Sequence, residues 1–484
     1  MSITTFAKLI TTSHSKKIYL AEIEPSERLT SWTLYSGSIY YSAIDTLDVQ
    51  SVVEDSTTLT EVSTLAAVTA GKWYHGKDKI YLQSTSGTPF SNVIVANYKL
   101  YIATENITLN DKFYIGHLLS VPVIRQQKAE IYWGVSVISS GEIIIANDAG
   151  EYDEKYKNYS WSNKNLTILM GGEDLPYAQY AEQFGGVITD KVLSTARFMI
   201  KFKDKKTELD DNIPKNVFDT TTYPNLDDED DGKPIPLAYG TVLKMPVVCT
   251  TLSLGTSTSL HTFKILDTSV CTVNSITQVY VNDNAVSHSS GSVSDASFKL
   301  ATATFTQGDS VTVSIIAKED NPVEQFKHIA SNVLSIPYNS TNYDTATVSL
   351  AVTAADSFPC GLAITESVPA LDVFGDLMKS CMGSLYVNNS GVYAVKIWDS
   401  QVSTGLTNID FNDIEEGSFS AKTKVDDIRK TVRIGWAKKW ASDSYAYKQL
   451  SSDTTEKVYG ITKSKTINIY RGKEIKKQSK TKEI

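Results

Sequence analysis

The sequence predicts a mainly β protein with a minor α component (α+β), divided into several domains. Its 484 residues are about three times the length of a usual single domain. It contains 53 Ser, 50 Thr and 26 Tyr, residue types that favour strands and turns over helices. Hydrophobic residues make up 41% of the chain, which is enough to form packed cores. A helix bundle, a small binding module and a disordered chain are therefore excluded.

Short strands separated by turns are expected in the first 150 residues. WTLYSGSIYYSAI (32–44) and KWYHGKDKIYLQ (72–83) each predict a hairpin, and period-two alternation places Trp73 and Tyr74 on opposite faces of a strand. Another hairpin is expected within 135–153, with its turn at Ser139-Ser140-Gly141. We assign residues 1–235 to an N-terminal β-rich region that carries an inserted β subdomain near residues 30–130.

The second half of this region contains less regular segments. LPYAQYAEQFGGVI (175–188) begins like a short helix, which should stop at Gly185-Gly186 before a strand resumes at Val187. The interval 203–231 is strongly charged and should be an exposed connection. GKPIPLAYGTV (232–242) alternates Pro, Gly and apolar residues, as expected for a rigid crossing strand.

Residues 236–318 return to Ser/Thr-rich alternation and predict a small antiparallel β domain. Two helices are expected in a helix–hairpin domain at 319–400. The first begins at Asn321 as N-cap with Pro322 in the first turn, and the second lies around 371–382. LYVNNSGVYAVKIW then predicts a hairpin. Residues 401–484 form a C-terminal β segment with a basic tail.

Charge and cysteine content limit the possible roles of the chain. A net charge of −9 argues against a surface that coats nucleic acid, although residues 463–484 carry a local net charge of +6, expected to be a solvated end. The start of the chain lacks a signal peptide pattern, and no window approaches the ~20 apolar residues of a membrane span, so synthesis in a cytosol is expected. Cys249, Cys271, Cys360 and Cys381 are widely spaced, and we expect free, buried thiols.

No catalytic residue and no cofactor are predicted. The sequence lacks the spacings of zinc, nucleotide and serine-nucleophile motifs. DDEDDG (227–232) places Asp227, Glu229 and Asp231 at the first, third and fifth positions of a calcium-loop pattern. Position 12 is Ala238 instead of Glu, so an exposed acidic turn is favoured over this weak candidate metal site.

Single His and aromatic residues have ordinary structural explanations. His328 should be a solvated helix histidine, because it lies off the apolar stripe of its helix. Trp73, Tyr74, Trp436 and Trp440 could stack on sugars, but their placement in strands favours core or subunit contacts.

The order of several segments resembles the baseplate or tail hub proteins of tailed bacteriophages. The segments span about residues 130–440. They are GEIIIANDAGEYD, NYSWSNKNLTILMGG, FGGVITD, the passage from Ile213-Pro214 to GKPIPLAYGTV (213–242), NPVEQFKHIASNVLSIPY, DVFGDLMKSCMGSLYVNNSGVYAVKIWD and DIEEGSFSAKTKVDDIRKTVRIGWAKKW. The helix followed by a hairpin with a small-residue start and an Asn/Gly turn is the most specific of them.

This resemblance implies a structural virion protein made in the bacterial cytoplasm. It implies a homotrimer whose chains each contribute two small β-barrel domains to a pseudo-six-fold ring. The ring would join the tail tube or a distal tail protein to fibre, spike or receptor-binding proteins, and viral DNA would pass its lumen without specific binding. Larger hub proteins continue into fibronectin-like or fibre domains that are not found here, so receptor contact by this chain itself is not expected.

Two other functions remain open at this point. A carbohydrate-binding adhesin or receptor-binding protein of the same tail is the first alternative. A cell-wall hydrolase is the second, since paired carboxylates among Glu142, Glu151, Asp153 and Asp190 could be assembled in space.

Overall fold

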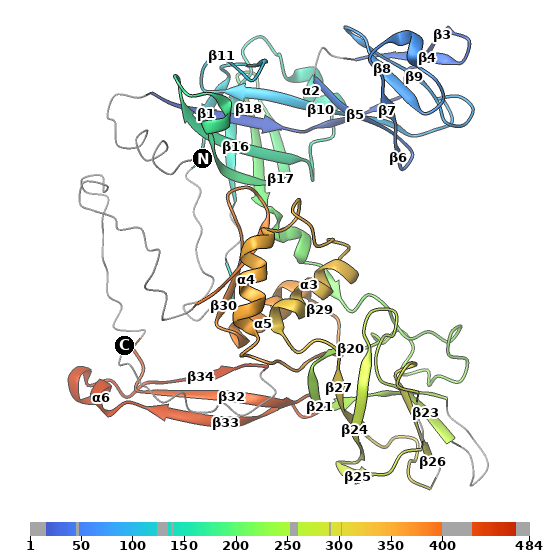
Figure 1. Ribbon diagram of the computed structural model, residues 1–484, viewed down its shortest axis with the longest axis vertical. Helices are drawn as coiled ribbons and strands as arrows, with labels where there is room; N and C mark the ends of the chain where they lie inside the picture. Colours follow the sequence, from blue (N-terminus) through green and yellow to red (C-terminus); the bar gives the residue numbers. More distant parts are fainter. Residues whose placement is uncertain are drawn as a thin grey trace. The chain divides into compact units, whose positions relative to one another are not determined.

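The computed structural model describes residues 16–44, 48–122, 134–136, 140–251, 260–289, 292–301, 303–398 and 428–470 (Figure 1). The chain forms two compact units. Unit 1 comprises residues 1–126, 138–207 and 387–392, and unit 2 comprises residues 127–137, 208–386 and 393–484. This division is coarser than the four segments expected from the sequence, and that finer division stays a prediction.

Unit 1 is built on a large antiparallel sheet. In spatial order its strands are β13 (Leu118–Ser120), β15 (Ser140–Ala146), β18 (Arg197–Asp204), β17 (Ala181–Leu193), β16 (Asn165–Gly172), β1 (Lys17–Ile23), β10 (Ile94–Ala103), β5 (Asp48–Glu54) and β6 (Thr57–Thr58), with β2 (Ser26–Leu29) also paired to β10. The short helix α2 (Asp153–Asn158) and the pair β11 (Ile107–Leu109) and β12 (Lys112–Tyr114) complete it.

A second sheet of unit 1 is formed between β2 and β10 in sequence. Its strands, in spatial order, are β3 (Thr33–Ser36), β4 (Ile39–Ala43), β9 (Lys79–Gln83), β8 (Lys72–His75) and β7 (Thr60–Glu61). Trp73, Ile80 and Leu82 are buried in the same hydrophobic core as the strands of the large sheet. The two sheets of unit 1 therefore share one core.

Two adjacent glycines allow close backbone contacts in the large sheet. A Cβ at Gly186 would lie 2.3 Å from the carbonyl oxygen of Lys203, and a Cβ at Gly185 would lie 2.8 Å from Cα of Gly391. The sequence analysis expects a helix to end at these glycines. That expectation is wrong, because β17 begins at Ala181 and runs through both residues after a single 3₁₀ turn at Tyr177–Gln179.

Unit 2 contains a larger sheet and several small ones. The larger sheet runs β25 (Asn284–Val286), β24 (Val273–Val281), β27 (Val311–Ala317), β21 (Thr241–Pro246), β32 (Thr431–Lys439) and β33 (Ser444–Ser451), with β34 (Ser464–Asn468) also paired to β32. The small sheets are β22 (Val248–Thr251), β23 (Leu260–Lys264) and β26 (Ser297–Ala301); β14 (Gly134–Val135), β30 (Gly383–Val387) and β31 (Tyr393–Ile397); β19 (Asn212–Ile213) and β29 (Val368–Pro369); and β20 (Leu237–Tyr239) and β28 (Leu362–Ile364).

Unit 2 has four described helices, α3 (Pro322–Asn332), α4 (Thr345–Ala355), α5 (Ala370–Ser380) and the short α6 (Asp453–Tyr459). The first three pack together, with aromatic rings between α3 and α5, whereas α6 has no buried residue. The ring of Phe326 on α3 contacts Phe374 on α5 at 4.9 Å between centroids, in an edge-to-face arrangement. The two helices predicted at 321 and 371 are confirmed, whereas α4 is absent from the sequence analysis.

The mainly β fold class with minor α content is confirmed. The hairpins predicted at 32–44, 72–83 and 385–398 form as β3–β4, β8–β9 and β30–β31. The hairpin predicted within 135–153 is wrong, because Ser140 and Gly141 already lie in β15, which pairs with β18; residues 137–139 lie outside the described residues. The described sheets are open, since none of their strand orders returns to its first strand, so the expected barrels are not seen there.

Candidate functional site

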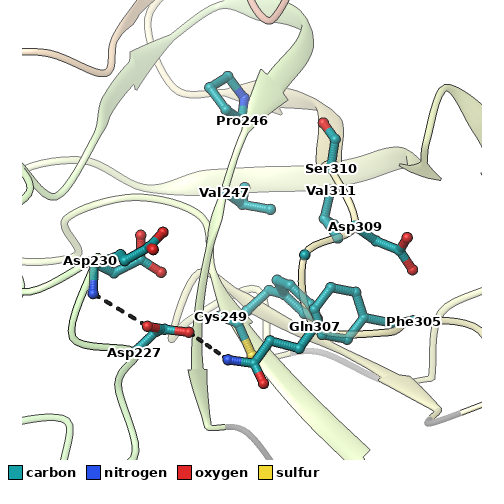
Figure 2. Close-up of a pocket in the computed structure, with 13 residues that line it drawn as sticks. Asp227, Asp230, Pro246, Val247, Cys249, Phe305, Gln307, Asp309, Ser310 and Val311 are labelled. Atoms are coloured by element: carbon teal, nitrogen blue, oxygen red, sulfur yellow. Dashed lines mark hydrogen bonds between the residues drawn. The ribbon is translucent and has the colours of Figure 1, made fainter.

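The acidic turn at 227–231 lies beside a cavity of unit 2 with a volume of about 520 Å³ (Figure 2). Asp227 and Asp230 line it on one side, and Gln307 and Asp309 line it on the other. Phe263 and Phe305 contribute apolar walls. The acidic turn therefore borders a cavity of unit 2.

Each carboxylate of the turn has its own partners. Asp227 accepts a hydrogen bond from the backbone N–H of Glu229 at 3.2 Å. It accepts a second from Nε2 of Gln307 at 2.7 Å, marked by a dashed line in Figure 2. These bonds, with the backbone bond the stronger cause, hold the pKa of Asp227 below its ordinary value. Asp230 pairs with Nζ of Lys233 at 2.6 Å.

The three residues of the calcium-loop pattern are not brought together. Glu229 and Asp231 are exposed, and Asp227 is half-buried. No three His, Cys, Asp or Glu side chains among the described residues are grouped so that they could hold a metal ion. The calcium site stays a weak prediction that the structure does not support.

Cys249 is the nucleophile candidate of this cavity. Burial raises the pKa of its thiol to about 11. Because the thiolate is the reactive form, a thiol with this pKa is a poor nucleophile near neutral pH. None of the four cysteines, all of which lie in described segments, forms a disulfide bond; Cys271, Cys360 and Cys381 are buried as expected, and Cys249 is half-buried.

A second candidate surface lies on the solvent face of β4, β9 and β8. Tyr41 is paired across the strands with Tyr81, and Tyr81 with Tyr74. We call these three residues the tyrosine row; their neighbouring ring centroids are 5.7 and 6.1 Å apart. Tyr35, which is 52% exposed, meets Tyr81 edge-on at 5.3 Å, and Nζ of Lys79 lies 4.6 Å from the ring centroid of Tyr41.

The tyrosine row combines flat rings with a cation, which suits stacking on a sugar or another planar or apolar ligand. The sequence analysis names Tyr74 but misses Tyr41 and Tyr81. Their period-two placement on two predicted hairpins is the signal that could have found them, once the register between β4 and β9 is known.

Two other sequence predictions need correction. Trp73 is 1% exposed and belongs to the core of unit 1, so it is not available for sugar stacking. His328 is only partly exposed: its Nδ1 lies 3.1 Å from the hydroxyl of Tyr239, and burial lowers its pKa. Trp436 and Trp440 are half-buried.

Comparison with known proteins gives little guidance. No family model and no curated protein matches the chain. Among solved structures, one match is a chain of a "Virion of native gene transfer agent (GTA) particle". It shares 11% identity and covers 50% of this chain and 84% of that chain, with a TM-score of 0.20, which is too low to establish a shared fold. Within the described ranges, no helix has the length and apolar character needed to cross a membrane.

Proposed function

We propose that this chain is a structural virion protein, a hub of the baseplate or tail tip in a phage-like particle. In this proposal three copies form a ring that joins the tail tube or a distal tail protein to fibre, spike or receptor-binding proteins. Viral DNA passes through the ring without specific binding. Catalysis and cofactors have no part in this role.

The helix–hairpin unit α5–β30–β31 carries the proposal. It is the most specific piece of the sequence resemblance to tail hub proteins, and the chain folds there as that pattern predicts. Asn388 and Gly391 close the turn through a backbone hydrogen bond of 3.0 Å, with further support from the Asn388 side chain. The small-residue start also has a physical reason, since a Cβ at Gly383 would lie 2.8 Å from Cδ1 of Ile397.

Co-assembly tests this role directly. The full chain is to be co-expressed with the tail-tube and distal tail proteins of the same particle, and the complexes measured by native mass spectrometry. We expect a complex that contains three copies of this chain. A monomer that binds host glycans and never associates with either tail protein would contradict the hub proposal.

A second function, that of a carbohydrate-binding adhesin, is favoured by one specific observation, the tyrosine row with Tyr35 beside it. Stacking of a sugar on exposed aromatic rings contributes on the order of 1 kcal/mol per ring. Binding of purified cell-envelope polysaccharide, measured by calorimetry, should then weaken in Tyr35→Ala. Phe113→Ala is the matched control, because Phe113 is also a strongly exposed aromatic of unit 1, at 57%, but lies on β12.

A further inference from the structure

The strands β32, β33 and β34, with helix α6, form an arm that has no hydrophobic core of its own. Figure 1 shows these strands as one extended sheet that runs from β21 to α6. Gly435 is the one buried residue in the three strands. A sheet normally buries one face against a second layer, and small isolated sheets are marginally stable in water. The described part of the chain provides no such layer for this arm.

The base of the arm is fixed to the body of unit 2. The hydroxyl of Tyr470 donates to Asp376 at 2.8 Å, and its backbone N–H donates to the hydroxyl of Ser380, also at 2.8 Å. The ring of Trp440 contacts that of Tyr470 at 5.3 Å, and the Trp440 N–H donates to the carbonyl of Leu243. These contacts hold the base in place and leave the distal end exposed.

Large apolar side chains are exposed toward the distal end. Leu450 on β33 is 53% exposed, and Val458 and Tyr459 on α6 are 63% and 59% exposed. Tyr447 on β33 is 43% exposed but lies on the opposite face of the strand, where the Arg433 guanidinium lies 3.8 Å from its ring centroid. Exposed apolar side chains on two consecutive elements are typical of a surface that binds another protein. An arm that interacted with its partner through charge alone would not need these exposed apolar side chains.

The net charge of the arm indicates which protein this surface binds. Residues 428–470 contain nine Lys and Arg against three Asp and Glu, a net charge of +6. Residues 208–386, the body of the same unit, contain eight Lys against 21 Asp and Glu, a net charge of −13. Opposite charges of this size favour association between the arm of one chain and the body of another.

We propose that the arm (residues 428–470) docks on the acidic body of unit 2 in a second copy of this chain. Leu450 of β33 and the apolar side chains of α6 become buried there, and the contact covers the face of the arm that carries Leu450. The inference rests on the proposed function, because it supplies the contact between neighbouring subunits of the ring.

Analytical ultracentrifugation of the full chain tests the proposal over a range of protein and salt concentrations. We expect self-association that weakens when salt rises from about 0.05 to about 0.5 M, since added ions screen the opposite charges. The double variant Leu450→Ser/Tyr459→Ser should raise the dissociation constant by about tenfold or more, because it removes two side chains that become buried. Leu119→Ser is the matched control; Leu119 is 58% exposed on β13 of unit 1, outside both the arm and the acidic body, and its loss should leave association unchanged.

Circular dichroism shows whether the double variant disturbs the fold of the arm. If it does, a charge variant provides a second test. Lys457 is exposed on α6, and Lys457→Glu should weaken association most strongly at low salt. The proposal is contradicted if the wild-type chain is monomeric throughout, if both variants associate as the wild type does, or if duplex DNA binds the arm in place of a second copy.

These outcomes are separable from the hub proposal. If the chain lies on the tail axis in particles but the arm variants associate as the wild type does, the docking proposal is contradicted and the hub proposal still stands. If the chain lies away from the tail axis, the hub proposal is contradicted. Sedimentation would still show whether the arm mediates self-association.

Discussion

Glu22 is a buried carboxylate at the centre of a polar cluster in unit 1. It is 6% exposed and accepts hydrogen bonds from the hydroxyls of Tyr114 at 2.6 Å and Tyr177 at 2.8 Å, and it pairs with Nζ of Lys99 at 2.8 Å. Burial alone would raise the pKa of Glu22. The bonds from Lys99 and the two tyrosines outweigh burial, so the pKa lies below its ordinary value.

Replacing Glu22 by Gln should destabilise unit 1 by about 2 kcal/mol, because a half-buried ammonium and two hydroxyls lose their charged acceptor. Urea unfolding at neutral pH measures the difference. Glu24→Gln is the matched control: Glu24 is 3.6 Å from the same lysine but 41% exposed, so its loss should cost less than about 0.5 kcal/mol. An equal loss of unfolding free energy in Glu22→Gln and Glu24→Gln would contradict the idea that burial makes the Glu22–Lys99 pair more important.

The pH dependence follows from the lowered pKa. The unfolded chain binds a proton at Glu22 more readily than the folded chain does, so the stabilising contribution is fully present above the ordinary pKa of 4.5. It is lost as the pH falls through the lower pKa of the folded state. The difference in unfolding free energy between wild type and Glu22→Gln should therefore shrink below pH 4.5, and a constant difference would contradict this account.

At the scale of single elements, Asn321 joins two helices. Its side-chain oxygen accepts from the N–H groups of Val323 at 2.9 Å and Glu324 at 3.2 Å, which caps α3. Its amide nitrogen donates to the carbonyl of Val352 at 2.9 Å and to Asp356 at 2.7 Å, at the end of α4. One side chain therefore satisfies groups at the start of one helix and the end of another.

Asn321→Ala should lower the unfolding free energy of unit 2 by about 2 kcal/mol, since the cap and two buried bonds are lost together. Asn321→Ser keeps an oxygen that can cap α3 but loses the amide donors, so it should recover about half of the loss. Thermal unfolding of the wild type, Asn321→Ala and Asn321→Ser measures their order of stability. A Ser variant no better than the Ala variant would show that the cap contributes little.

The sequence predicts elements well where local chemistry decides them. Asn321 and Pro322 mark the start of α3, and paired alternation with a turn between marks the hairpins. Helix α4 is missed because its sequence, TATVSLAVTAA, is small and β-branched and has no clear apolar stripe; Asp344 as its N-cap is the remaining signal. β17 is misassigned because the glycines are required by close contacts with distant backbone, which a local pattern does not contain.

The candidate sites were predicted only in part for the same reason. The acidic turn is largely exposed, as expected, but the prediction of an exposed connection over 203–231 is wrong for its first part, where Asp204 and Lys206 form a buried ion pair. The neighbours of the turn in the cavity wall, Gln307 and Asp309, are some 80 residues away in sequence. The tyrosine row depends on the register between β4 and β9, whose paired residues are about 40 positions apart. Trp73 was a candidate by residue type, and its burial follows from the packing of the whole unit.

At the scale of the whole molecule, unit 2 contains both a basic arm, whose sheet has an uncovered face, and an acidic body. Both features fit a chain that completes its packing in an assembly, as a ring-forming subunit does. The acidic body also suits a DNA conduit, because a polyanion does not adhere to a surface of the same charge.

The most direct test of the hub role is electron microscopy of the particle with this chain labelled at a defined site. The proposed function predicts label density on the tail axis at the tail tip, with three copies around it. Density at the periphery of the tail, in fibres or side appendages, would contradict the hub role and favour the adhesin.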